Sequence, residues 1–144
     1  MGYKFSFATQ ATSCPQEAAL MMTIGILICG HFVDDIKATY GTYCDLYADM
    51  LGEGFECVPY FVCEGELPAS VQEQDAWLVS GSRSGAYEDL PWIKPLEAFL
   101  VEAYSAQVPV VGICFGHQIL AQALGGRGER EGEDGRVEKE ARGR

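Results

Sequence analysis

The sequence predicts an α/β protein built on a parallel β-sheet. Residues 23–29 form a continuous apolar run, which is typical of a strand covered on both faces. Segments with the apolar spacing of helices alternate along the chain with further short apolar runs. A cysteine flanked by two glycines stands where one such run meets a helical segment. Strands that alternate with helices across short loops form βαβ units with right-handed crossovers, so we expect a single parallel sheet.

The first half of the chain predicts two strands and one helix. The strand at residues 23–29 ends at Gly30 and His31. Apolar side chains then recur at helical spacing over residues 43–51, and glycines close this stretch. Residues 56–62 predict the second strand.

The second half predicts two strands and two helices. Residues 76–79 predict a short strand, which runs into a turn of small residues at 80–85. We expect the next helix to open near Asp89 and Pro91, with Asp89 as its cap and the proline in the first turn. Its apolar stripe comprises Ile93, Leu96, Phe99, Leu100 and Ala103. Residues 109–113 predict the last strand. The helix after it has a stripe of Ile119, Leu120, Ala123 and Leu124.

Composition divides the 144 residues into three parts. We expect residues 1–21 to be a loose extension, because they show no apolar period. Residues 22–126 have the composition of one folded domain. Residues 127–144 contain 12 charged side chains and no aromatic one, which is typical of a disordered tail.

The net charge restricts the partners. The chain carries 21 acidic and 10 basic side chains, a formal charge of −11. Such a chain repels phosphate backbones and anionic lipids, so we expect neither nucleic acid nor membrane as a partner. The longest apolar stretch, residues 18–29, is shorter than the roughly 20 residues that span a bilayer. A small-molecule substrate is the partner class that remains.

Six cysteines are present, at positions 14, 29, 44, 57, 63 and 114. An even number would permit three disulfides in a secreted protein, but Cys29, Cys57 and Cys114 lie in or beside apolar runs without paired spacing. Free thiols in a reducing compartment fit better, which predicts a cytoplasmic protein. With only His31 and His117 available, we expect no metal site, and no motif calls for a cofactor.

The strand-to-helix junction at residues 112–116 carries the chemistry. Cys114 lies between Gly112 and Gly116, the G-x-nucleophile-x-G pattern of a nucleophile elbow. Small flanking residues permit a strained turn, so we expect Cys114 to have a positive φ and an exposed side chain. The following helix offers its positive end to a thiolate, and the N–H of Phe115 points where an oxyanion would form. The alternative is an inert buried thiol at a glycine-rich turn.

Two segments resemble the class I glutamine amidotransferases, specifically the stand-alone domains similar to GMP synthase. They are PVVGICFGHQ at residues 109–118, and residues 80–87 followed by Pro91-Trp92-Ile93. The resemblance covers about residues 23–126 and implies a flavodoxin-like sheet with helices on both faces. It also implies that a cysteine attacks the side-chain amide of glutamine, forms a γ-glutamyl thioester and releases ammonia.

Carried onto this sequence, the resemblance makes Cys114 the nucleophile. It implies that the N–H groups of Phe115 and of the turn at Gly81 and Ser82 form the oxyanion hole, and that Gln118 helps to hold the substrate. The turn departs from the family, because it has Ser82 and Arg83 where many relatives have Gly-Pro.

A larger departure lies after the cysteine. The family completes its triad with a His-x-Glu pair far downstream, and no histidine follows His117 here. We therefore expect a domain truncated on its C-terminal side and a chain with little or no activity. His117 is expected to be a helix-surface residue, and His31 to shape the pocket.

Two rival functions remain open. Relatives include γ-glutamyl peptidases, which would use the same cysteine on γ-glutamyl conjugates. A non-catalytic binding or redox-sensing protein would use Cys114 without turnover. The ammonia acceptor, a synthetase partner and self-association are left open by the sequence.

Overall fold

The computed structural model describes residues 21–126, which form a parallel four-stranded sheet. The strands are β1 (Met22–Leu27), β2 (Phe55–Tyr60), β3 (Ala76–Val79) and β4 (Val110–Gly112), in the order β2-β1-β3-β4. Ile24 lies opposite Cys57 on one side and Ala76 on the other, which makes β1 a central strand. The order 2-1-3-4 is that of flavodoxin-like sheets, so the predicted fold class is confirmed.

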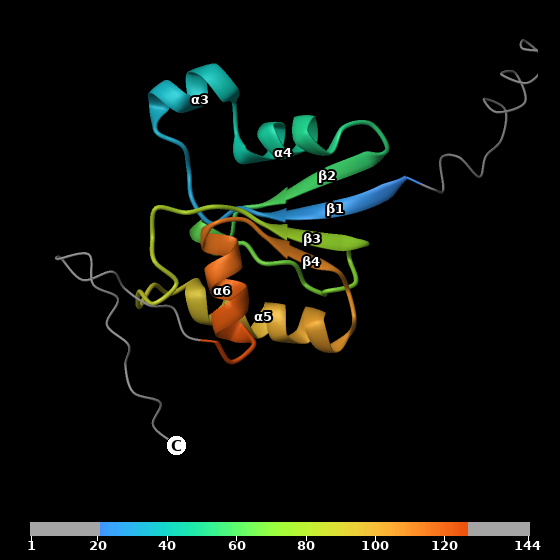
Figure 1. Ribbon diagram of the computed structural model, residues 1–144, viewed down its shortest axis with the longest axis vertical. Coiled ribbons are helices and arrows are strands. Elements are labelled where there is room, and N and C mark those ends of the chain that lie inside the picture. The colour runs from blue at the N-terminus through green and yellow to red at the C-terminus, as the bar shows by residue number, and fades with distance from the viewer. Residues whose placement is uncertain (1–20, 127–144) are drawn as a thin grey trace, which may run out of the picture.

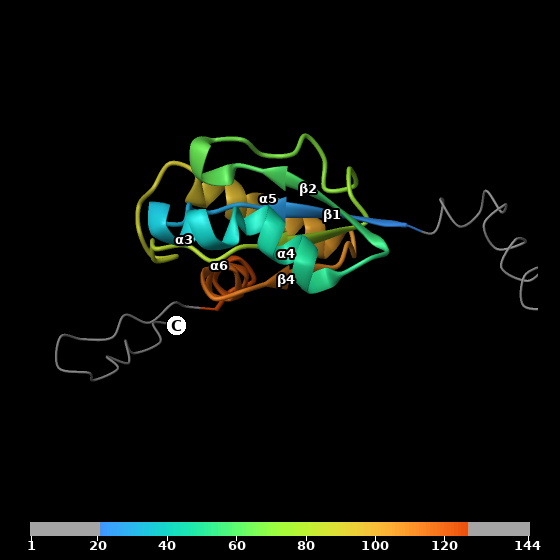
Figure 2. The same ribbon diagram turned by 90° about the horizontal axis from the view of Figure 1, so that it is seen from above.

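Helices cover both faces of the sheet, as Figure 1 shows. Helix α4 (Tyr43–Leu51) packs on one face, while α5 (Ile93–Ser105) and α6 (Phe115–Ala123) pack on the other. Helix α3 (Asp34–Tyr40) lies beyond the arrowheads of β1 and β2 in both views, and a 3₁₀ turn, η1 (Val62–Glu64), follows β2 (Figure 2). This arrangement leaves the carboxyl ends of the strands free to form a site.

The larger core lies beneath α5 and α6. All five predicted stripe residues of α5 are buried. Their neighbour Trp77 on β3 meets Phe99 edge-on at 4.9 Å and donates its Nε1–H to Val71 O at 2.8 Å. Gly25 of β1 leaves room for this indole, because a Cβ there would lie 2.1 Å from the ring. Burial of the apolar stripe therefore fixes α5 against the sheet.

The helices differ from the predictions in two respects. The helix over 43–51 is confirmed, and Thr42 begins it with a capping box to Asp45. Helix α5, however, begins at Ile93, and its N-cap Trp92 makes no side-chain cap hydrogen bond. Asp89 is therefore not the cap. The sequence also missed α3, a seven-residue helix that buries none of its side chains.

The predicted extension and tail fall almost entirely outside the described residues. The domain boundaries at 22 and 126 remain predictions. None of the helices between residues 21 and 126 has the length and apolar composition needed to cross a membrane.

Candidate active site

Cys114 stands at a strained turn between β4 and α6. Its backbone has φ 52° and ψ −109°, it is the N-cap residue of α6, and it is exposed to solvent. The predicted positive φ is thus confirmed. A Cβ on Gly112 would lie 2.3 Å from Gly116 O, and a Cβ on Gly116 would lie 2.2 Å from Val79 O. Both flanking glycines are therefore required by the close approach of α6 to β3 and β4.

The turn after β3 lies directly beside this cysteine. A Cβ on Gly81 would be 3.9 Å from Cys114 Cβ. Gly81 donates its N–H to Tyr47 Oη at 3.4 Å, a long hydrogen bond. The N–H groups of Ser82 and Phe115 make no hydrogen bond to any residue between 21 and 126. Both N–H groups are therefore unpaired within the described residues.

A buried serine holds the ends of β1 and β3 together. Ser80 is completely buried, and its Oγ accepts the N–H of Cys29 at 2.8 Å and donates to Gly81 O at 2.9 Å. Both bonds restrain the backbone that leads into the turn at Gly81. The sequence marked Ser80 only as a small turn residue.

We expect Ser80→Ala to lower the free energy of unfolding by about 1–3 kcal/mol, because the buried N–H of Cys29 would lose its partner. Urea denaturation measures this change. Ser105→Ala is the control, since Ser105 Oγ donates to Val101 O at 2.9 Å on an exposed helix surface. An equal, small effect of the two substitutions would contradict the bridging role.

Two tyrosines of α4 reach the same turn. Tyr43 Oη lies 3.4 Å from the position of a Cβ on Gly81, and the Tyr43 and Tyr47 rings stack at 5.8 Å. Burial raises the pKa of each tyrosine, and the neighbouring Cys114 raises it further. Both hydroxyls therefore stay protonated and can act as hydrogen-bond donors.

Neither histidine hydrogen-bonds to Cys114. His31 Nε2 donates to Glu64 Oε1 at 2.8 Å, and Cys63 Sγ lies 3.6 Å from the same nitrogen. His117 is exposed on α6. Gln118, the predicted substrate-binding residue, is also exposed, and its N–H donates to Cys114 O at 3.1 Å.

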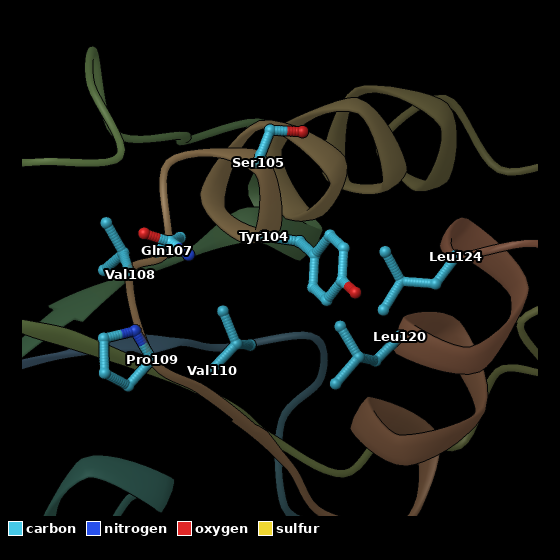
Figure 3. Close-up of a pocket in the computed structure, with 8 residues that line it drawn as sticks. All are labelled: Tyr104, Ser105, Gln107, Val108, Pro109, Val110, Leu120 and Leu124. Carbon is cyan, nitrogen blue, oxygen red and sulfur yellow. The ribbon is translucent and has the colours of Figure 1, made fainter.

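Two cavities lie on this side of the molecule and share Gly30, His31 and Glu64. One, of about 260 Å³, lies between α3, α4 and η1 and is lined by Lys37 and Tyr43 among others. The other, of about 400 Å³, is lined by Ser82 and Arg83 among others. A larger hollow of about 660 Å³ lies between α5, β4 and α6, where the Tyr104 ring points toward Leu120 and Leu124 (Figure 3). Its lining contains no charged side chain.

The other thiols differ from Cys114 in their surroundings. All five cysteines of the described region are free. Burial raises the pKa of Cys29 far above the ordinary range, and burial together with Glu64 raises the pKa of Cys63. No group of three or more potential metal ligands is found within residues 21–126.

The family model for class I glutamine amidotransferases matches residues 56–143, more than half of the chain. The chain belongs to this family. It is 35% identical over 94 residues to Gamma-glutamyl peptidase 4 of Arabidopsis thaliana, an alignment that covers 63% of this chain and 38% of that protein. It is 38% identical over 75 residues to the glutamine-hydrolyzing GMP synthase of Pyrobaculum aerophilum, covering 51% of this chain and 14% of that protein.

A crystal structure of a glutamine amido transferase from Methylobacillus flagellatus is also similar. It is 27% identical, with a TM-score of 0.46, and the match covers 74% of this chain and 39% of that one. This chain therefore spans about two fifths of the length of that structure and of the Arabidopsis peptidase.

Proposed function

We propose that Cys114 is the nucleophile of a γ-glutamyl transfer reaction, with glutamine as the first candidate substrate. The observation that carries this proposal is the exposed thiol at φ 52°, held at the N-terminus of α6 with the turn at Gly81 beside it. The N–H groups of Phe115 and Ser82 are unpaired within residues 21–126. A helix N-terminus favours a thiolate, and backbone N–H groups favour an oxyanion.

The reaction has two steps. Cys114 Sγ bonds to the side-chain carbonyl carbon of glutamine, the carbon–nitrogen bond breaks, and the thiol proton leaves with the nitrogen as ammonia. Water then cleaves the γ-glutamyl thioester, which gives glutamate and restores the thiol. Phe115 and Ser82 stabilise the oxyanion in both steps, with Gly81 when its N–H turns from Tyr47. Gln118 helps to hold the glutamyl group.

A second candidate substrate is a γ-glutamyl peptide. Several similar proteins of Arabidopsis thaliana are named gamma-glutamyl peptidases. The covalent chemistry would be the same, except that an amine of the peptide leaves in place of ammonia. The cavity beside Tyr43 offers space for such a leaving group.

We also propose a cytoplasmic location, because the thiols of the described region are free. With glutamine as the substrate, ammonia needs an acceptor, so a synthetase partner would complete the reaction.

The test is a covalent adduct on the full chain. After incubation with glutamine and an acid quench, we expect the mass of the protein to rise by one glutamyl group, located at Cys114 by peptide mapping. Cys114→Ala should show no adduct, whereas Cys63→Ala should retain it. Alkylation of Cys114 that glutamine and γ-glutamyl peptides do not slow, with no adduct, would favour a non-catalytic thiol instead.

A further inference from the structure

Positive charge is scarce in the folded domain, and two of its three basic side chains line cavities. Residues 21–126 hold three basic and fourteen acidic side chains. Lys94 pairs with Glu97 at 3.2 Å within α5. Lys37 and Arg83 form no ion pair within these residues, and each lines one of the two cavities described above. Glu64 lines both cavities as well, but its carboxylate is hydrogen-bonded to His31. The unpaired cations therefore favour a negatively charged ligand.

The cavity that Lys37 lines is connected to the cysteine turn through Tyr43, which lines the cavity and also reaches Gly81. The Tyr43 ring packs on Phe32 with centroids 4.0 Å apart. Phe61 forms another part of the wall. The cavity thus combines aromatic walls with a cation, a combination suited to an amino acid with a free carboxylate.

We propose that this cavity, the leaving-group pocket, binds the departing part of a γ-glutamyl peptide and that Lys37 binds its terminal carboxylate. The proposal rests on the peptide alternative of the proposed function. Glutamine releases only ammonia, which has no group for Lys37 to bind. A γ-glutamyl amino acid presents a side chain to Phe32, Tyr43 and Phe61, and a carboxylate to Lys37. Lys37 is therefore a specificity residue that distinguishes peptides from glutamine.

Two ligands that differ only in the terminal group test this assignment. They are γ-glutamyl-phenylalanine and γ-glutamyl-phenylalaninamide, titrated calorimetrically into the full chain carrying Cys114→Ala. We expect Lys37→Met to weaken binding of the acid roughly fivefold, which is about 1 kcal/mol, and to leave binding of the amide within about twofold. Lys94→Met is the matched control and should change neither affinity.

Several results would overturn the proposal. They are an equal loss for both ligands, no loss for either, or no binding of the two ligands to the protein that retains Lys37. Lys37 is exposed on α3, so its substitution should leave the circular dichroism spectrum unchanged. Because the titration needs no turnover, its outcome is independent of the thioester measurement. A missing adduct with a selective Lys37 effect would reject the covalent chemistry alone.

Discussion

Glutamine hydrolysis by this 144-residue chain is expected to be about 10² to 10⁴ times slower than a positioned imidazole would allow. The departing nitrogen must gain a proton as it leaves, and a well-placed general acid typically contributes that factor. His31 is hydrogen-bonded to Glu64, and His117 is exposed and makes no hydrogen bond to Cys114. Ammonia leaves as the thioester forms, so this step lacks its acid and should be slow.

Ammonia release by the purified chain, compared with that by its Cys114→Ala variant, measures this rate. We expect a slow release in the parent protein that disappears in the variant. Rapid alkylation of Cys114 by iodoacetamide should accompany it, since the thiol is exposed. A turnover of about one per second, in the usual range of enzymes, would show that another group supplies the proton. His31→Ala and His117→Ala would then identify which histidine acts.

The elements that bury an apolar stripe could be predicted from the sequence. The α5 stripe is buried as expected, because its five apolar residues recur at the helical period. The elbow could also be predicted, because the glycines two residues before and after Cys114 are required by close backbone contacts. Helix α3 has no buried residue, so no hydrophobic period marks it. The N-cap of α5, Trp92, makes no side-chain cap hydrogen bond. The start of this helix therefore could not be located by searching the sequence for a capping residue.

The polar contacts of the site were harder to predict from the sequence. Periodicity placed Tyr43 and Tyr47 on the buried face of α4, but it does not say where a hydroxyl at the tip of a buried ring will end. Their contacts with Gly81 depend on how α4 crosses the sheet. His31 and Glu64 are 33 residues apart in sequence and meet only because η1 follows β2. Such pairings come from tertiary packing, which local sequence patterns do not encode.

The glycine in the first turn of the elbow helix should be the least replaceable residue near the site. Gly116 lies within α6, where alanine would be favoured by about 1 kcal/mol on helix propensity alone. A Cβ at this position would nevertheless lie 2.2 Å from Val79 O and 2.9 Å from Val79 Cβ. Val79 is paired with Leu27 and Gly112 in the sheet, so β3 cannot move aside.

We therefore expect Gly116→Ala to lower the free energy of unfolding by about 2–4 kcal/mol and to slow the alkylation of Cys114. Urea denaturation and timed iodoacetamide labelling measure the two effects. Gly65→Ala is the control, because Gly65 has φ 92° but open space around it, so alanine there meets backbone strain of about 1–2 kcal/mol without a clash. If Gly116→Ala proved milder than Gly65→Ala, α6 would not approach β3 closely, and the strained elbow would lose its structural basis.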